Sequence, residues 1–401
     1  MDQEINSSTP VVVFKCPGYA GLGIVRSLGR LGIPVYSMVD DVLDAPAFHS
    51  RYCAGKSRCS SHFTEKVIGE LLDVGRRIGR RSVLIVTYDE LAIFVAENAD
   101  RLREQFIFPD QTAGLVRSLC SKREMHHKAR AQGVPTAEIF FPRSREEVLD
   151  FLKRSSFPIV VKAIHGWLWR RPVGGRMAIA STERELLDIY DAMEPNVILQ
   201  EYIPGGEDTN WIFTGYFNDR SDCLFGFTGK KIRQWPLRRG VTTLGVCLKN
   251  ETVDQTTRRF MKDIRYRGIV DVDYRYDARD GKYKVLDVNP RMGANFRIFV
   301  TNNGMDVVRA LYLDMTRQPI VPGIVCDGRK WIVEDYDFLS ALTCMSKGDL
   351  TFEQWSNSLR GVQETAYFAA DDLLPFLHMS IRFCWRLVPR RGIGRLMEWG
   401  M

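Results

Sequence analysis

Acidic and amide side chains recur at every second position in the segment GIVDVDYRYDARDGKYKVLDVNPRMGANFR, residues 268–297. Asp271 and Asp273 form one such pair, and Asp287 and Asn289 form the other. In a β-strand, residues two apart point to the same face, so each pair presents its oxygen atoms together. Carboxylate and amide oxygens are ligands that Mg²⁺ prefers. The spacing therefore indicates a metal site made by Asp273, Asp287 and Asn289.

Two short strands joined by a tight turn would bring these oxygens together. Residues 269–276 and 283–288 have strand composition, and Asp280 with Gly281 between them is typical of a hairpin turn. Arg291 follows the second strand, which adds a guanidinium group beside the metal. A metal ion next to a guanidinium suits a polyphosphate ligand. The alternative is that these aspartates are only solvated residues of exposed strands.

The order of this motif, a carboxylate on one strand, a turn, and then Asp-x-Asn-Pro-Arg, resembles the metal-binding hairpin of the ATP-grasp superfamily of carboxylate–amine ligases. The opening GYAGLGIVRSLGRLGIPVY, with SRYC at residues 50–53, looks like the pre-ATP-grasp domain of the D-aspartate ligase type. The resemblance spans roughly residues 11–333. It implies that ATP converts a carboxylate into an acyl phosphate, which an amine then attacks with release of ADP and phosphate.

Two lysines are candidates for binding the phosphates of ATP. Lys162 lies in the apolar strand of residues 157–163, and a lysine in such a strand is costly unless it is paired or bound to an anion. Ser121 opens a capping box that puts Lys122 at the first position of a helix, where the helix dipole favours an anion. An exposed surface lysine is the alternative for Lys122. In the superfamily a lysine at each of these places reaches the phosphates.

The resemblance assigns further contacts around the strand of residues 197–203. They are Gln200, Glu201 and Ile203 to the adenine base, Glu207 or Asp208 to the ribose, and Lys231, Arg233 and Arg291 to the triphosphate and the carboxylate. An extended edge strand offers free amide and carbonyl groups, and a carboxylate accepts two hydroxyl donors. For Lys231 and Arg233 the alternative is a solvated basic loop that follows a strand. The glycines of residues 165–177 suit a phosphate lid, although its Trp and Arg residues depart from the usual lid.

The first hundred residues have the pattern of an open α/β sheet. Residues 11–14 form a buried strand that leads into a Gly-rich turn and a helix, and residues 34–39 form the next strand. The glycine spacing is not G-x-G-x-x-G, so a dinucleotide site is not favoured. The strand of residues 83–87 ends at Asp89 and Glu90, for which helix capping is favoured over binding of a substrate amine.

The sequence therefore predicts a fold of the α/β and α+β classes, with the chain divided into three parts. A pre-ATP-grasp open α/β domain is expected at residues 1–119 and a two-lobed ATP-grasp domain at residues 120–333. Lobe one would comprise residues 120–203 and lobe two residues 204–333. A mainly helical C-terminal extension follows at residues 334–401.

Composition sets the outer bounds of the function. The chain has 401 residues, 45% of them hydrophobic, which is enough for two or three domains. No apolar run approaches the roughly 18 residues of a spanning helix, and the polar start is no signal peptide, so we expect a cytoplasmic protein. The nine cysteines form no C-x-x-C pair, which argues against zinc or disulfides. Residues 376–388 mix aromatic residues with arginine; core packing is favoured there, with membrane-surface or partner-helix contact as the alternative.

The net charge of +7 is spread along the chain, so it fits an anionic small ligand and predicts no nucleic-acid partner. The expected cofactors are ATP and Mg²⁺, with Mn²⁺ as a substitute, and the expected substrates are a small carboxylate and an amine, such as amino acids. The sequence is compatible with both a monomer and a homodimer.

One competing hypothesis is a regulatory protein that binds ATP without turnover, because Asp287 stands where the superfamily more often has Glu. An NAD(P)-dependent oxidoreductase lacks the necessary glycine spacing.

Overall fold

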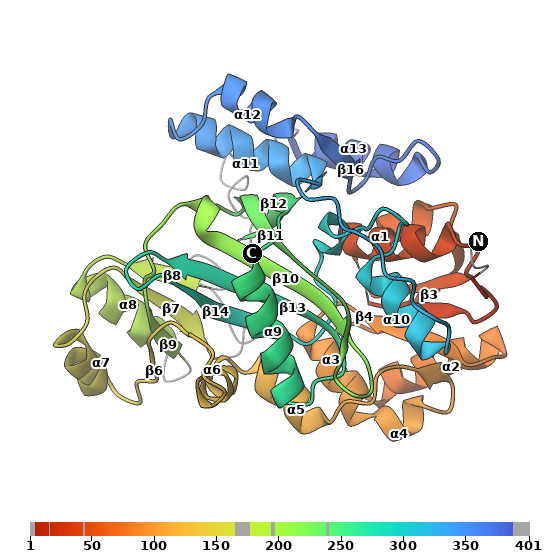
Figure 1. The fold of residues 1–401 in the computed structure, drawn as a ribbon, viewed down its shortest axis with the longest axis horizontal. Coiled ribbons are helices and arrows are strands. Elements are labelled where there is room, and N and C mark those ends of the chain that lie inside the picture. The colour runs from red at the N-terminus through yellow and green to blue at the C-terminus, as the bar shows by residue number, and fades with distance from the viewer. Residues whose placement is uncertain are drawn as a thin grey trace.

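The computed structural model of the protein describes residues 5–15, 17–42, 45–164, 177–193, 197–237 and 240–387. Three β-sheets organise these residues, and Figure 1 shows helices packed against them and a blue helical layer above. One sheet is parallel, and the other two are antiparallel or nearly so. This combination confirms the predicted α/β and α+β class.

The N-terminal sheet is parallel and has the apolar strand β1 at its centre. In spatial order its strands are β3 (Cys53–Arg58), β2 (Val35–Val39), β1 (Val11–Phe14), β4 (Ser82–Val86) and β5 (Phe106–Ile107). Its helices are α1 (Gly18–Gly29), η1 (Pro46–His49), α2 (Glu65–Ile78), α3 (Asp89–Glu97) and α4 (Ala99–Leu102). The sequence pattern does not reveal β3, because its side chains alternate between half-buried and exposed at the sheet edge.

A four-stranded antiparallel sheet follows, after two short helices. The helices are α5 (Ala113–Cys120) and α6 (Lys122–Ala131). In spatial order the strands are β6 (Ile139–Phe140), β9 (Val197–Glu201), β7 (Ile159–Ala163) and β8 (Met177–Ala180), covered by α7 (Arg145–Leu152) and α8 (Glu183–Met193). The Ser121 side chain accepts a hydrogen bond from the Glu124 amide at the start of α6, which confirms the predicted N-cap. The predicted capping box is incomplete, because the Ser121 amide donates to the Arg117 carbonyl and not to the Glu124 side chain.

The seven-stranded sheet carries the predicted hairpin at one edge. In spatial order its strands are β14 (Lys282–Asn289), β13 (Gly268–Asp277), β10 (Asn210–Phe217), β11 (Cys223–Trp235), β12 (Val241–Cys247), β15 (Lys330–Ile332) and β16 (Val362–Thr365). Its connections include η3 (Glu207–Thr209), α9 (Glu251–Asp263), η4 (Phe296–Ile298) and α10 (Val307–Met315). Lys231 and Arg233 therefore lie within a long strand, and the alternative of a loop that follows a strand is wrong for them.

The C-terminal extension forms the helical layer at the top of Figure 1. Its helices are α11 (Glu334–Ser346), α12 (Phe352–Leu359) and α13 (Leu374–Leu387), while β16 adds a parallel strand beside β15. Because β15 and β16 come from opposite sides of residue 333, the predicted division there cuts through one sheet. The divisions at residues 119 and 333 stay predictions. No helix in the described ranges has the length and apolar character that crossing a membrane requires.

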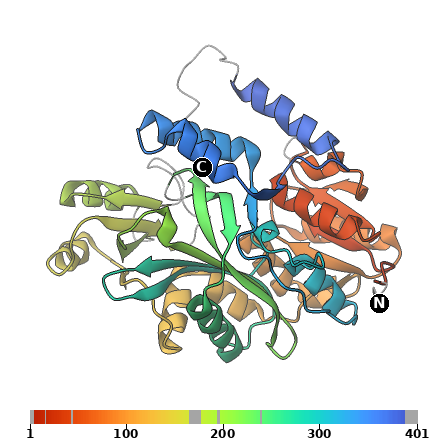
Figure 2. The same ribbon diagram turned by 45° about the horizontal axis from the view of Figure 1, so that its top comes forward.

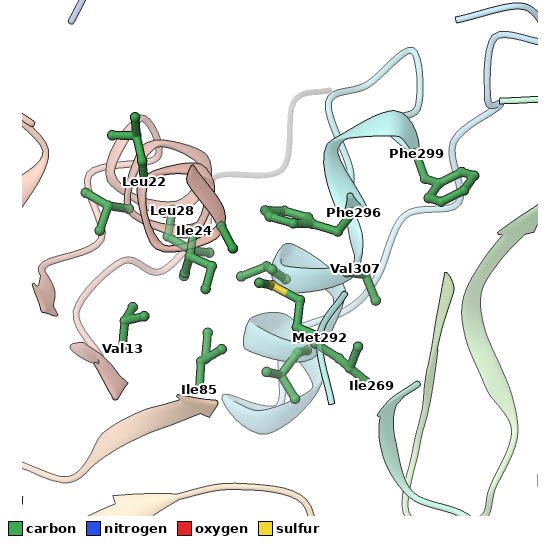
Figure 3. Packing of buried hydrophobic residues seen from close by; sticks show 14 of the residues in the cluster. Val13, Leu22, Ile24, Leu28, Ile85, Ile269, Met292, Phe296, Phe299 and Val307 are labelled. Carbon is green, nitrogen blue, oxygen red and sulfur yellow. The ribbon is translucent and has the colours of Figure 1, made fainter. Parts of the chain in front are cut away.

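A shared hydrophobic core joins the N-terminal sheet to the seven-stranded sheet. Figure 3 shows Leu22 and Leu28 of α1 on one side of it and Met292 and Phe296 on the other. Phe296 is fully buried, and a Cβ at Gly23 would lie 3.1 Å from its ring, so glycine allows the helix to approach this closely. This packing fixes the segment that follows β14, which carries Arg291, against the N-terminal sheet.

Candidate active site

A cavity of about 1160 Å³ lies where the three sheets and the C-terminal extension meet. Many of the residues predicted from the sequence line it: Lys122, Lys162, Gln200, Ile203, Lys231, Arg233, Asp273, Asp287, Asn289 and Arg291. Two others, Glu201 and Asp208, are not on its wall, and the side chain of Glu207 falls outside the described part of the chain. The structure thus gathers residues that span almost 170 positions of sequence.

Strand register brings the predicted oxygen ligands together. Asp273 on β13 lies directly opposite Asp287 on β14, and Asp271 lies opposite Asn289. A register shift follows Asp273, so the regular pairing of the hairpin changes at the acids. The turn is as expected, since the Gly281 amide donates 2.8 Å to the Asp277 carbonyl and Gly281 has a φ of +69°.

Each of the two opposed carboxylates forms an ion pair with a lysine in the cavity. Asp287 pairs with Lys122 at the start of α6, and Asp273 Oδ1 lies 2.6 Å from Nζ of Lys231 on β11. Burial lowers the pKa of Lys122, although nearby Asp89 and Asp273 oppose that shift. The cavity is therefore lined by paired positive and negative side chains. Each of the two lysines could exchange its carboxylate partner for a phosphate group.

The oxygen atoms at this site are of the types that bind Mg²⁺, but the site has few of them. Asn289 uses its Nδ2 to donate 3.2 Å to the Asp271 carbonyl, which leaves its amide oxygen available as a ligand. Among the described residues no cluster of three or more His, Cys, Asp or Glu side chains could hold a metal. Mg²⁺ commonly takes one or two carboxylates and completes its octahedron with water and phosphate oxygens. Asp273, Asp287 and Asn289 match that pattern.

Asp271 is a buried acid that the sequence analysis left out of the metal set. It is 6% exposed and accepts a hydrogen bond of 2.8 Å from the Thr214 hydroxyl. Burial, with Asp273 close by, raises the pKa of Asp271 to about 6. A Cβ at Gly293 would lie 2.4 Å from its carboxyl carbon, so only glycine leaves room for this carboxyl group. The two-residue spacing from Asp273 is the sequence signal that marks it.

Lys162 has an ammonium group without a counter-ion among the described residues. It lies on β7 and lines the cavity, and among the described residues no hydrogen bond or ion pair reaches its Nζ. Burial, together with the charge of Lys122, lowers the pKa of Lys162 to about 7. A second cation beside a desolvated lysine is unfavourable by itself and becomes favourable once an anion lies between the two.

Arg291 connects the hairpin to the N-terminal sheet through Asp89. Its Nε donates 3.0 Å to Asp89 Oδ1, across 202 positions of sequence, and both residues line the cavity. The capping role favoured for Asp89 is wrong, because Tyr88 is the N-cap residue of α3 and no side chain caps there. Asp89 is instead a cavity residue, and only its place after a parallel strand hinted at this.

The proposed base-binding segment divides between two sides of β9. Gln200, which is 8% exposed, and Ile203 line the cavity. The Glu201 carboxylate faces the other way, where it accepts hydrogen bonds of 2.9 Å from Lys284 and 2.6 Å from Arg279. Alternation along the strand explains the difference. Glu201 therefore does not offer its side chain to a ligand in this cavity.

Arg233 has a structural partner in the C-terminal extension. Its Nε and Nη2 donate 2.8 and 2.9 Å to the two carboxylate oxygens of Asp337 on α11, and Nη1 donates 2.6 Å to Ser358. Both members of this pair are buried. The bidentate contact holds the extension over the cavity, a role that the sequence could not show. Of the predicted lid at residues 165–177, only Met177 belongs to the described part of the chain; it begins β8 and lines the cavity.

Comparison with known proteins finds a relative in sequence and solved structures of similar fold. No family model matches the chain. D-aspartate ligase from Enterococcus faecium (strain Aus0004) is 26% identical over 243 residues, which is 57% of this chain and 58% of that protein. The chain therefore matches less than two thirds of the relative's length.

Solved structures that resemble this one include ligases, synthetases and biotin carboxylases. The ADP complex of N5-carboxyaminoimidazole ribonucleotide synthetase has a TM-score of 0.63 and 11% identity, with 82% of each chain covered. L-amino acid ligase from Bacillus licheniformis has a TM-score of 0.61 and 14% identity, with 81% of this chain and 79% of that chain covered. The chain thus resembles a D-aspartate ligase in sequence and has the fold of the ATP-grasp carboxylate–amine ligases.

Proposed function

We propose that this chain is an ATP- and Mg²⁺-dependent carboxylate–amine ligase that forms an amide or peptide bond through an acyl phosphate. The observation that carries the proposal is the convergence of two opposed carboxylates, Asp273 and Asp287, with three lysines that line the same cavity. Acids and lysines in that arrangement suit a nucleotide triphosphate with its metal. The named ligases and the ADP-bound synthetase among the similar proteins support it.

ATP would lie along the cavity from the four-stranded sheet to the hairpin. The adenine would pack beside Gln200 and Ile203, and the phosphates would replace the carboxylates as partners of Lys122 and Lys231 and would give Lys162 a partner. Asp273, Asp287 and Asn289 would hold Mg²⁺, which when bound neutralises charge on the phosphates. A ribose contact from Glu207 or Asp208 remains a prediction.

The acid and the amine would lie at the end of the cavity nearest the N-terminal sheet. A carboxylate oxygen attacks the γ-phosphorus, the bond to the ADP oxygen breaks, and an acyl phosphate results. The amine nitrogen then attacks the acyl carbon, loses a proton, and phosphate leaves. Arg291 carries positive charge to this end of the cavity, and Asp89, its partner, is an acid that can bind an ammonium group. Amino acids fit both needs, and two similar proteins are named for acting on them.

A regulatory protein that binds ATP without turnover is the second candidate. Asp287 favours it, because its short side chain is already paired with Lys122 and the described site has few carboxylates.

An ADP-release assay across pairs of amino acids, one as acid and one as amine, separates the two functions. The ligase should release ADP and phosphate only when ATP, Mg²⁺ and both amino acids are present. The regulatory protein should gain thermal stability from ATP and release no ADP with any pair. Stabilisation by NAD⁺ and not by ATP would contradict both.

A further inference from the structure

The SRYC motif that begins at Ser50 has no part in the proposed ATP site, yet it contacts the C-terminal extension. The Ser50 hydroxyl donates 2.7 Å to Asp372 Oδ2, and the Arg51 amide donates 2.9 Å to Oδ1 of the same carboxylate. The Tyr52 hydroxyl donates 2.7 Å to Asp371 Oδ2. The motif therefore binds two adjacent acids that lie 319–322 positions away in the sequence.

Two arginines of α1 hold the same pair of acids. Arg26 donates 2.9 Å through Nε to Asp372 Oδ2 and 2.7 Å through Nη2 to the Asp372 carbonyl. Arg30 donates 2.9 and 2.8 Å through Nε and Nη2 to the two oxygens of Asp371. The pair of Arg26 and Asp372 is buried, with 6% and 2% of the side chains exposed, so it is the stronger restraint of the two. We give the name acid clasp to the residues of these contacts: Arg26, Arg30, Ser50, Arg51, Tyr52, Asp371 and Asp372.

The acid clasp fixes the chain shortly before α13 begins at Leu374. The segment that leads up to it is held from a second side as well. Glu334 at the start of α11 accepts hydrogen bonds of 2.7–3.1 Å from the amides of residues 366–368. Arg26 also donates to the carbonyls of Ala366 and Tyr367. The start of α13 is therefore tied both to the N-terminal sheet's first helix and to its own extension.

Helix α13 forms part of the wall of the large cavity. His378, Met379 and Arg382 line the cavity from this helix. The ring of His378 stacks on that of His49 in η1, with centroids 4.1 Å apart, and Met379 is buried in the main core. Figure 2 shows α13 as the deep blue helix beside the red N-terminal elements. Core packing, the interpretation favoured for residues 376–388, is therefore correct for this inner face, while the outer face is exposed.

This wall belongs to the end of the cavity proposed for the two substrates. The parallel strands β1, β2 and β4 are each followed by a residue that lines the cavity, namely Pro17, Pro46 and Thr87. Ligands of open α/β sheets bind at this carboxyl edge. Asp89 and Arg291 pair at the same edge, whereas Gln200 and Ile203 line the cavity from the four-stranded sheet. Helix α13, stacked on η1, therefore lies beside the proposed acid and amine and not beside the adenine.

We propose that Asp372 is a positioning residue, which fixes α13 through the acid clasp and so sets the wall against which the acid and the amine lie. The part of this proposal that concerns substrates rests on the proposed ligase function, whereas the hold on α13 does not. Asp372 itself touches neither substrate, because it acts through the side chains that α13 presents to the cavity. A change in the acid clasp should therefore weaken binding of the amino acids and leave ATP binding intact.

Asp372→Asn in the full chain tests the proposal. Both carboxylate oxygens of Asp372 accept hydrogen bonds, so the amide nitrogen of asparagine must face a donor, and Arg26 loses its buried counter-ion. The amides of α13 should exchange hydrogen about tenfold faster or more, while those of α9 keep the wild-type rate. In the ADP-release assay, KM for the amino acids should rise about tenfold or more, with kcat and the affinity for ATP nearly unchanged.

Asp277→Asn is the matched control. The Asp277 side chain is 1% exposed and pairs with Arg279 and Lys284, and it is not among the described residues that line the cavity. This control should lower the melting temperature as Asp372→Asn does, yet leave the exchange of α13 and the KM for the amino acids unchanged. A purely structural loss would give the same result for both variants.

A second clasp variant, Ser50→Ala with Tyr52→Phe, removes two hydrogen bonds and leaves no buried charge without its partner. It should fold and show the same pattern with a smaller effect, so it carries the test if Asp372→Asn does not fold. Wild-type exchange of α13 in the clasp variants, or faster exchange with an unchanged KM for the amino acids, would overturn the proposal.

Failure of the proposed ligase function would be seen separately, as a wild type that releases no ADP with any pair of amino acids. In that event wild-type exchange in the clasp variants would still overturn the hold of the acid clasp on α13, and faster exchange would support it.

Discussion

Replacing Asp287 by alanine should abolish ligation, with turnover falling on the order of 10³-fold or more, since a catalytic metal contributes several kcal/mol of charge stabilisation. Asp287 is one of two opposed carboxylates, and its loss leaves Asp273 and Asn289 as the remaining protein ligands. The fold should survive because the side chain is 25% exposed and lies near the end of a strand at the cavity. The measurements are ADP release at saturating ATP and the melting temperature.

Asp222→Ala is the matched control for this variant. Asp222 also pairs with a lysine, Lys262, at 2.6 Å, but it precedes β11 and does not line the cavity. We expect normal turnover from the control. Addition of Mg²⁺ should increase ATP-dependent thermal stabilisation in the control and change it little in Asp287→Ala. Wild-type turnover in Asp287→Ala, or an undiminished effect of Mg²⁺, would show that Asp287 does not bind the metal.

Lys162→Met should weaken ATP binding by roughly 10- to 100-fold, because a charge-assisted hydrogen bond is worth about 1.5–3 kcal/mol. Methionine keeps most of the volume of the side chain while it removes the charge that has no counter-ion in the described structure. The unfolded lysine has its ordinary pKa near 10.5, whereas the folded one titrates at about 7. Charged Lys162 therefore destabilises the folded protein fully below pH 7 and progressively less as the pH rises towards 10.5.

Two pH dependences follow from that pKa. Without ATP, Lys162→Met should be more stable than the wild type at and below pH 7, and the difference should vanish near pH 10.5. Bound phosphate raises the pKa of Lys162, so ATP binding takes up a proton above pH 7. The ATP affinity of the wild type should then fall with rising pH relative to that of Lys162→Met. Because ATP itself ionises in the same way in both experiments, the comparison cancels that contribution. Melting curves and isothermal titration across pH measure both.

Lys153→Met, in the exposed segment after α7, is the control for side-chain chemistry. It should leave ATP affinity and its pH dependence unchanged. Equal affinity of the wild type and Lys162→Met at pH 7 would mean that Lys162 has a structural role only.

The sequence predicts the hairpin well because local rules govern it. Alternation puts Asp273 and Asp287 on one face, the Asp-Gly turn sets their register, and the structure pairs them as a result. Lys162 could be recognised for a similar reason, since a lysine within an apolar strand needs an anion. In each case the signal lies within a few residues of the functional side chain.

Contacts between distant segments could not be predicted in the same way. Asp89 reaches Arg291 only because the shared core packs α1 against the segment after β14. Arg233 has the composition of a phosphate ligand, yet it pairs with Asp337 on an element that the sequence leaves unplaced. Glu201 shows a further limit of prediction from sequence. Side chains alternate along a strand, so Glu201 and Gln200 must point to opposite faces, but the sequence does not reveal which of the two faces the cavity.

Hydroxylamine trapping tests the central claim, that the cavity makes an acyl phosphate from ATP. Hydroxylamine is a small nucleophile that can replace the amine. The reaction contains ATP, Mg²⁺, hydroxylamine and one amino acid from a panel that includes D-aspartate. With at least one acid, the protein should give a hydroxamate and an equal amount of ADP, and omission of ATP or Mg²⁺ should stop it. AMP and pyrophosphate in place of ADP, or ATP binding without hydroxamate from any acid, would contradict the account.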